Sequence, residues 1–376
     1  MSLRNSFNGS IVKPGFNPLG AQTSVTYYNL LSWGDNGYGQ LGLGNTTYYS
    51  SPKQVGALTT WLTIASGYYH PISVKTDGTL WTWGYNALGQ LGLGNTTTYS
   101  SPKQVGALTT WSKVAAGDYH TISVKTDGTL WTWGYNNVGQ LGLGNTTNYS
   151  SPKQVGSLTT WSAIAGGGAH TVSVKTDGTL WTWGQNNYGQ LGIGNTTYKS
   201  SPNQVGALTT WLKIAAGYAH TISVKTDGTL WTWGRNNLGQ LGLGNTTNYS
   251  SPKQVGALTT WLTIAGGSRN FTVSVKTDGT LWTWGQNNYG QLGIGNTTYY
   301  SSPKQVGALT TWLTIAAGDY HTISVKTDGT LWTWGYNNFG QLGIGNTTNY
   351  SSPKQVGSLT TWSAIAGGRY FTVARG

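Results

Sequence analysis

The sequence predicts an all-β protein, a seven-bladed β-propeller of four-stranded blades whose ring is closed by pairing of the N- and C-terminal strands. Three observations support this prediction. A unit of about 50 residues recurs seven times, each unit contains four short strand-like runs, and the two chain ends carry complementary halves of one unit. The composition agrees, because 57 Gly, 20 Trp and 23 Tyr favour strands joined by glycine-rich turns over helices.

The most regular part of the unit is the segment Lys-Thr-Asp-Gly-Thr-Leu-Trp-Thr-Trp-Gly, which stands unchanged at residues 75–84, 125–134, 175–184, 225–234, 276–285 and 326–335. Asp-Gly between two alternating runs predicts a β-hairpin with a two-residue type I′ turn, in which both turn residues have positive φ. Alternation places Leu130 and Thr132 on one side of the second strand and Trp131 and Trp133 on the other. One side of each hairpin therefore carries two indoles.

Each unit is expected to contain four strands, here called A to D. In the unit that begins at Trp111, these strands are predicted over residues 111–116, 120–125, 129–133 and 151–155. Because consecutive strands alternate in direction, the A–B and C–D connections share one face of the ring, which we call the loop face. The Asp-Gly turns between B and C share the opposite face, which we call the turn face, with the D–A connections.

The chain ends predict how the ring closes. Residues 29–33 align with strand C, and residues 369–376 align with strand B and stop before any Asp-Gly turn. We expect residues 29–33 to pair with residues 370–374, since this pairing removes two free strand edges. Residues 27–376 then form one propeller domain. Residues 1–26 resemble no other part of the chain and are expected to be an extended N-terminal arm that could dock on a partner.

The repeat has the spacing A-G-x-x-H-T-I-S-V-K-T-D-G-T-L-W-T-W-G-x-N-x-x-G-Q-L-G-L-G-N, followed by S-P-K-Q-V. This pattern closely resembles the repeat of the regulator of chromosome condensation family, and the resemblance extends over residues 27–376. The resemblance implies a seven-bladed propeller closed by its terminal strands. It leaves function open, because the family spans an exchange factor for the small GTPase Ran, a plant ultraviolet-B photoreceptor and a secreted β-lactamase inhibitor.

The net charge of +12 comes mostly from lysines at fixed repeat positions, which predicts a ring of solubilising charge rather than one concentrated patch. Nucleic-acid binding is therefore only weakly indicated. The chain has no Cys, so disulfides and Cys-based zinc sites are excluded. No apolar run is long enough for a membrane span, and the N-terminus lacks the apolar region of a signal peptide. The compartment stays open.

Catalysis is not expected. Five histidines open strand B, yet two units place Phe271 and Phe371 at the same position, which indicates a packing role. Asp118 and Asp319 each stand two residues before a His, but no carboxylate or thiol recurs there to build an acid–base or nucleophile system. We therefore expect no enzymatic activity, no cofactor and no metal site.

The candidate binding site follows from where the near-identical units differ. Variation concentrates in the A–B and C–D connections, and it is rich in Tyr, Asn, Gln and Arg, residue types that suit binding loops. We predict that the loop face binds a protein or a glycan, with drift in tolerant loops as the alternative explanation. The predicted partner-binding residues are Tyr68, Tyr69, Tyr119, Tyr218, Arg269, Tyr320, Arg369 and Tyr370 at the inner rim, and Tyr85, Tyr135, Arg235 and Tyr336 further out.

The sequence therefore favours a non-catalytic, tryptophan-rich recognition or structural module, for example an adhesin or a structural protein of a virion or cell surface. Two alternatives stay open. One is a cytoplasmic regulator of a small GTPase or a chromatin-binding protein. The other is a protein inhibitor of an enzyme, which the missing signal peptide disfavours.

Overall fold

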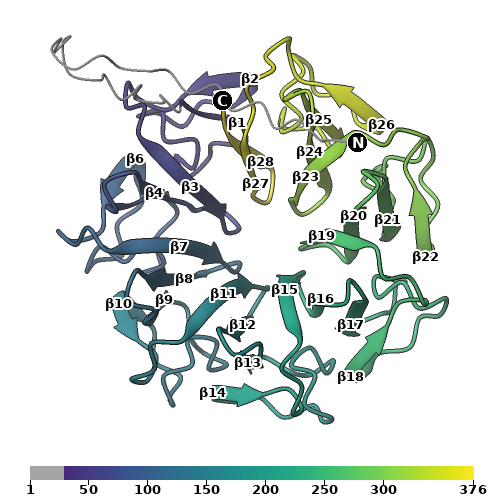
Figure 1. Cartoon of the computed structure of the whole chain (residues 1–376). Helices are drawn as coiled ribbons and strands as arrows, with labels where there is room; N and C mark the ends of the chain where they lie inside the picture. Colours follow the sequence, from purple (N-terminus) through teal and green to yellow (C-terminus); the bar gives the residue numbers. More distant parts are fainter. Residues whose placement is uncertain (1–28) are drawn as a thin grey trace, which may run out of the picture.

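The computed structural model describes residues 29–376, which form 28 strands in seven four-stranded antiparallel sheets. The sheets stand side by side around a central hollow, so the predicted all-β, seven-bladed propeller is confirmed (Figure 1). Residues 29–376 contain no helix long and apolar enough to cross a membrane. The predicted arm, residues 1–26, lies outside the described residues.

Six blades are built from consecutive strands, and each is named here by its four strands. The first two contain β3 (Trp61–Ser66), β4 (Pro71–Lys75), β5 (Leu80–Gly84), β6 (Tyr99–Gln104), and β7 (Trp111–Ala116), β8 (His120–Lys125), β9 (Leu130–Gly134), β10 (Tyr149–Gln154). The next two contain β11 (Trp161–Gly166), β12 (His170–Lys175), β13 (Leu180–Gly184), β14 (Lys199–Gln204), and β15 (Trp211–Ala216), β16 (His220–Lys225), β17 (Leu230–Gly234), β18 (Tyr249–Gln254). The last two contain β19 (Trp261–Gly267), β20 (Phe271–Lys276), β21 (Leu281–Gly285), β22 (Tyr300–Gln305), and β23 (Trp312–Ala317), β24 (His321–Lys326), β25 (Leu331–Gly335), β26 (Tyr350–Gln355).

The seventh blade joins the two ends of the chain. It contains β1 (Leu30–Gly34), β2 (Tyr49–Gln54), β27 (Ala364–Gly367) and β28 (Phe371–Arg375), in the order β2-β1-β28-β27. Leu30 pairs with Arg375 and Gly34 with Phe371, so the predicted closure of the ring is confirmed. The paired segments are residues 30–34 and 371–375, each shifted by one residue from the predicted 29–33 and 370–374. Figure 1 shows the purple start of the propeller beside its yellow end. No sheet edge of these two strands is left open.

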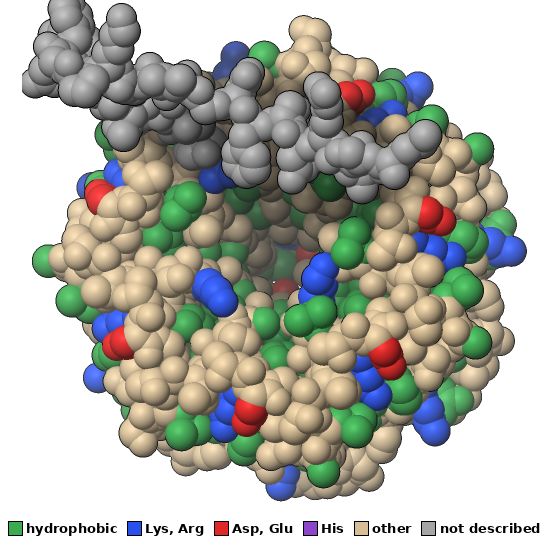
Figure 2. Space-filling view, in the orientation of Figure 1, with side chains coloured by type: hydrophobic (Ala, Val, Ile, Leu, Met, Phe, Trp, Pro, Cys, Tyr) green, Lys and Arg blue, Asp and Glu red, His purple; other side chains and the backbone are tan. Residues whose placement is uncertain are grey.

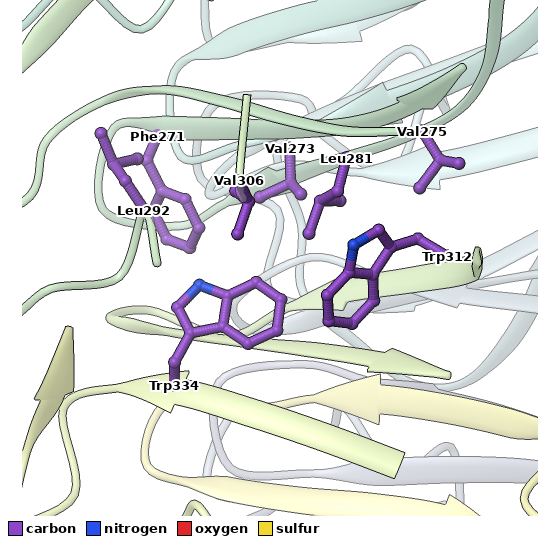
Figure 3. Close-up of a cluster of buried hydrophobic side chains, with 8 residues drawn as sticks. All are labelled: Phe271, Val273, Val275, Leu281, Leu292, Val306, Trp312 and Trp334. Carbon is purple, nitrogen blue, oxygen red and sulfur yellow. The ribbon is translucent and has the colours of Figure 1, made fainter. Parts of the chain in front are cut away.

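The core lies between blades. At the junction of the β19–β22 and β23–β26 blades, Phe271, Val273 and Leu281 from one blade meet Trp312 and Trp334 from the next (Figure 3). The same cluster recurs around the ring with the same residue types. Because side chains of a central strand alternate, each blade presents indoles to one neighbour and aliphatic side chains to the other. Each junction therefore buries large apolar surface on both sides.

The Asp-Gly turns differ from the prediction. Among residues 29–376 the one non-Gly residue with positive φ is Asn270, so the turn Asp residues have negative φ and the type I′ turn is wrong. Instead, Gly78 N–H donates to the Lys75 carbonyl and Lys75 N–H donates to the Thr79 carbonyl, which encloses a three-residue loop. Only Gly78, with φ of 77°, takes the left-handed conformation. The Asp77 side chain then accepts hydrogen bonds from Thr79, which fixes the loop.

The strand-B histidines are buried, which agrees with the packing role predicted for them. They also form hydrogen bonds to the next blade, which the sequence did not indicate. His120 Nε2 lies 3.0 Å from the Thr171 hydroxyl of the next blade, and this hydroxyl donates to the Gln140 carbonyl at 2.8 Å. Because Thr171 uses its only proton on the carbonyl, His120 donates from Nε2. Burial lowers its pKa to about 3. Where Phe371 replaces His, the next blade has Pro71 in place of this Thr.

Candidate functional site

The loop face carries tyrosines that touch one another across neighbouring blades. Tyr68 and Tyr69 follow β3, and their rings lie 4.8 Å apart. Tyr119, which follows β7, lies 5.5 Å from Tyr68 and 6.1 Å from Tyr85. Tyr38, from the β1–β2 connection, lies 4.9 Å from both Tyr69 and Tyr85. Connections of three adjacent blades therefore build one aromatic cluster.

A second aromatic cluster lies on the other side of the closing blade. Tyr289 lies 5.1 Å from Tyr320 and 4.6 Å from Tyr336. Tyr370, which precedes β28, lies 5.6 Å from Tyr336 and stacks on Phe339 at 4.7 Å. These rings come from the β19–β22, β23–β26 and closing blades. These rings are half-buried, so part of each ring is exposed to solvent and neighbouring residues cover the remainder.

Arg369 joins the two clusters. Its guanidinium lies 4.5 Å from the Tyr68 ring and 4.6 Å from the Tyr370 ring, and it donates a hydrogen bond to the Tyr69 hydroxyl. Arg269 adds a second link, since its Nη2 donates to the Tyr68 hydroxyl at 3.1 Å. Contacts between a guanidinium and aromatic faces restrain both partners. We call this continuous surface the aromatic arc, with members Tyr38, Tyr68, Tyr69, Tyr85, Tyr119, Tyr135, Arg269, Tyr289, Tyr320, Tyr336, Phe339, Arg369 and Tyr370.

The residue inserted into one repeat explains how Arg269 reaches the arc. The insertion lengthens β19 to seven residues, and in the β19–β20 connection Asn270 adopts the left-handed conformation with φ of 56°. Asn tolerates this conformation better than most residues. Its side chain accepts a hydrogen bond from Gln240 Nε2 at 3.1 Å, which anchors the connection. The extra residue therefore directs one basic side chain toward the channel mouth.

Two carboxyl groups lie at the loop-face mouth of the central channel. Asp319 is 1% exposed, and its Oδ2 lies 3.5 Å from Arg269 Nε and 3.9 Å from Arg369 Nε. Burial, together with the nearby Asp118 carboxyl, raises the pKa of Asp319 to about 8 even though both guanidiniums act to lower it. Burial likewise raises the pKa of Asp118 to about 6. The mouth therefore holds two acids whose pKa values are raised by burial, and two arginines oppose this rise.

The channel behind this mouth is a cavity of about 460 Å³. Its wall is mainly the Ile, Val and Ala side chains of the innermost strands, such as Ile64, Val114 and Ile164. Asp118, Asp319 and Arg369 line one end of it. The loop face therefore has a polar depression at its centre and an aromatic rim around part of its circumference.

Ten of the twelve predicted site residues belong to the aromatic arc. Tyr218 and Arg235 do not, because they come from the β15–β18 blade, where Arg235 contacts Tyr188 at 5.0 Å and bonds Asn237. The prediction missed Tyr38, Tyr289 and Phe339, which lie at variable C–D positions, and Asp118 and Asp319 at the mouth. The signal for these residues was in the sequence, since each lies at a position that varies among the seven units.

Nothing in residues 29–376 resembles a metal site, because these residues contain no group of three His, Asp or Glu side chains able to hold an ion. The histidines are fully buried and donate to threonines, so they are unavailable as general bases toward a substrate. The expectation that the chain is not an enzyme stays a prediction.

Fold and site together define a class of protein, a closed seven-bladed propeller with an arc of tyrosines and arginines on its loop face. The chain belongs to the regulator of chromosome condensation (RCC1) repeat family. The model of the RCC1-like domain matches residues 28–268, and models of the RCC1 repeat match residues 278–325 and 328–375, and residues 262–291 and 313–341. No curated protein sequence is significantly similar to the chain.

Solved structures give the same fold at low sequence identity. Prp20p of Saccharomyces cerevisiae, described with its binding to Gsp1p and histones, is 21% identical with a TM-score of 0.84, covering 94% of this chain and 92% of its own. Yeast RCC1 (Prp20) in a structure with Kap60 is 19% identical with a TM-score of 0.83, covering 100% and 96%. Human WBSCR16 is 21% identical with a TM-score of 0.83, covering 93% and 98%.

Proposed function

We propose that the chain is a recognition module that binds a folded protein through its loop face. The observation that carries this proposal is the aromatic arc, a continuous surface of tyrosines from five blades that two arginines hold in place. Tyr and Arg are the residue types that contribute most to protein interfaces, and restrained rings lose little conformational entropy on binding.

The comparisons favour a regulator over the other classes that the sequence left open. Prp20p is described as binding Gsp1p and histones, and a relative is seen with Kap60, so propellers of this architecture bind folded proteins. Neither of these two relatives, Prp20 and WBSCR16, is described as an adhesin, a virion protein or an enzyme inhibitor. A protein partner of the small-GTPase class is therefore the first to test. The net charge of +12 argues against a basic partner such as a histone.

The test measures binding to a Ran-type GTPase, in its nucleotide-free and GDP-bound forms, and to proteins captured from the native source. Replacing Tyr119, Tyr320 and Tyr370 by Ala should weaken binding by about 2 kcal/mol or more in sum. Replacing Lys125, Lys225 and Lys326 by Ala is the matched control, since these lysines lie at the turn face and should matter little. A partner that responds to the lysines and ignores the tyrosines would contradict the proposal.

A further inference from the structure

The turn-face side of the ring carries a groove that recurs between adjacent blades. Four copies enclose about 380, 440, 430 and 450 Å³, within the size range of small-ligand pockets. Each has the same walls. Between the β15–β18 and β19–β22 blades the lining includes Gln254, Leu258, Trp261, Lys276, Trp282 and Pro303. The groove is separate from the aromatic arc, because its lysine and its tryptophans lie where strand B ends and strands A and C begin.

A lysine lies in each of these grooves and forms no direct ion pair, although the charge of the nearby turn Asp acts on it. The Lys276 side chain is 6% exposed, and its Nζ lies 3.7 Å from the Trp282 ring and 4.9 Å from the Trp261 ring. Both ion pairs within residues 29–376 belong to the channel mouth, so no groove lysine takes part in one. The nearest acid along the chain is Asp278, which accepts its hydrogen bonds from Thr280. An ammonium held against indoles keeps its donors available for an anionic group.

The other walls of the groove have the chemistry of a surface that binds a sugar ring. Leu258 is 49% exposed, and the equivalent leucines are 47% to 51% exposed in all seven D–A connections. Leu258, Pro303 and the half-buried Trp282 offer an apolar wall. Gln254 and Ser302 offer hydrogen-bonding groups beside it. Apolar side chains suit the C–H face of a sugar, and amides and hydroxyls suit its hydroxyl groups.

We propose that these grooves bind the acidic residues of a glycan, with the lysine ammonium holding the sugar's carboxylate or sulfate, and the Leu, Pro and Trp wall contacting its ring. Figure 2 shows basic side chains recurring around the ring, several of them beside an acidic side chain, with apolar side chains between them. This arrangement suits a polymer that presents the same acidic unit repeatedly. The grooves would add a second ligand to the chain, independent of the protein partner proposed for the loop face.

The closing blade supplies a natural variant of the groove. Six junctions have Lys and Trp at the two central positions, and the lysines are Lys75, Lys125, Lys175, Lys225, Lys276 and Lys326. At the seventh junction, Leu31 stands in place of this Trp and Gly376 in place of this Lys. The Lys–Trp contact of the groove therefore occurs at six junctions, including the four whose volumes are given above. Six linked sites raise the apparent affinity for a polymer well above the affinity of one site.

The experiment compares two variants with the same change in charge. One replaces the six groove lysines by Met, which keeps an unbranched side chain between the indoles. The other replaces the six strand-D lysines by Met, namely Lys53, Lys103, Lys153, Lys253, Lys304 and Lys354, which are exposed and lie over tyrosine rings. Each variant lowers the net charge from +12 to +6, since six positive charges are removed. The full-length chain is used throughout.

The probes are hyaluronan for a carboxylated glycan, heparin for a sulfated one, dextran for a neutral one, and duplex DNA and single-stranded RNA. We expect hyaluronan or heparin to bind, dextran not to bind, and the groove variant to lose about 100-fold or more in affinity while the strand-D variant loses less than about 10-fold. Tighter binding of hyaluronan would identify a carboxylate as the group bound by the lysine, and tighter binding of heparin would identify a sulfate. In case the sixfold groove variant does not fold, Lys276→Met alone should lower the number of bound uronic-acid oligosaccharides per chain by one, and Lys276→Arg should restore it.

Three results would overturn the proposal. Equal losses in the two variants would show general attraction to polyanions. Tighter, groove-dependent binding of DNA or RNA would make the ligand a nucleic acid. Failure of both acidic glycans to bind the wild-type chain would leave the grooves without this ligand. None of these results bears on the loop face, whose partner is tested with the tyrosine variants.

Discussion

The two faces of the ring are built from the same repeated unit, yet they differ in what varies. At the turn face, the Asp-Gly loop and the lysine between two indoles are the same in six copies. At the loop face, the A–B connections hold Tyr, Asp, Gly, Ala, Ser or Arg at equivalent positions. The varied residues gather into one arc on one side of the channel mouth rather than spreading evenly. A constant scaffold on one face thus allows specialisation on the other.

The difference has a structural cause. The Asp-Gly turns bury their glycines against backbone, and a Cβ at Gly128 would lie 2.0 Å from the Thr159 carbonyl oxygen. Loop-face tyrosines instead contact mainly one another and remain half-buried. Substitution is therefore costly at the glycine of an Asp-Gly turn and less costly at the loop-face tyrosines. The following predictions test this difference, beginning with a change that affects both faces.

Removal of residues 369–376 should have the largest effect. It deletes β28, which lies between β1 and β27, together with the buried side chains Phe371 and Val373. We expect the free energy of unfolding to fall by about 4 kcal/mol or more, and the exposed strand edges to promote association. Chemical denaturation and size-exclusion chromatography measure the two effects. A truncated chain that unfolds like the full chain and stays monomeric would contradict closure by this strand.

A pair of turn-face glycines tests the packing argument. Gly128 and Gly156 both have positive φ, of 78° and 60°, but only Gly128 has neighbours where a Cβ would lie. Gly128→Ala should therefore cost about 3 kcal/mol, from the left-handed conformation plus the clash. Gly156→Ala should cost about 1 kcal/mol, from the conformation alone. Urea denaturation compares the two variants. Equal costs would show that the close approach to Thr159 does not constrain the turn.

The buried histidines predict sensitivity to acid. The pKa of His120 is lowered by burial to about 3, below the usual value of 6.5. Stability from its neutral form is therefore fully present above pH 6.5 and is lost as the pH falls toward 3. His120→Phe should fold, because the chain already carries Phe271 and Phe371 at the equivalent position. The variant should lose about one fifth less stability between pH 6.5 and pH 3, because five buried histidines contribute to this acid sensitivity. An unchanged slope of stability against pH would show that His120 does not titrate on unfolding.

Two aspartates, one on each face, should give the smallest effects and opposite signs. The pKa of Asp118 is raised to about 6, so its contribution to stability is full below about pH 4 and is lost as the pH rises through 6. Hydrogen bonds from Thr129 lower the pKa of Asp127, so its contribution is present at neutral pH and is lost on acidification. Asp118→Asn should flatten the slope between pH 4 and 6, whereas Asp127→Asn should destabilise the protein at pH 7. If both substitutions changed the slope of stability against pH in the same direction, the opposite pKa shifts given for Asp118 and Asp127 would be wrong.

The fold could be predicted almost entirely from the sequence, because the repeat shows its period, its strand alternation and its complementary ends directly. Strands predicted over residues 111–116 and 120–125 coincide with β7 and β8. The turn was wrong, because Asp-Gly also suits a three-residue loop, and choosing between the two loops depends on hydrogen bonds such as that from Gly78 to Lys75. Local sequence does not determine that choice.

The candidate site was less predictable, because residues far apart in sequence build it. Variable positions identified most of the arc, but the contact of Arg369 with Tyr68 joins residues about 300 apart. Tyr218 shows the converse, since it has the expected residue type at the expected position but lies outside the arc. The pairing of Asp319 with Arg269 and Arg369 depends on how seven blades converge at the channel mouth.

The closing blade has one more consequence, for how this chain could be rearranged. Asn29 and Gly376 exchange backbone hydrogen bonds of 3.2 Å and 3.1 Å, so the two ends of the propeller lie side by side. A short linker between them would leave every strand pair intact, and the chain could then be opened at an exposed D–A connection in another blade. Such a circular permutant would keep both faces in place while moving the seam around the ring. The position of the seam is thus separable from the architecture that it closes.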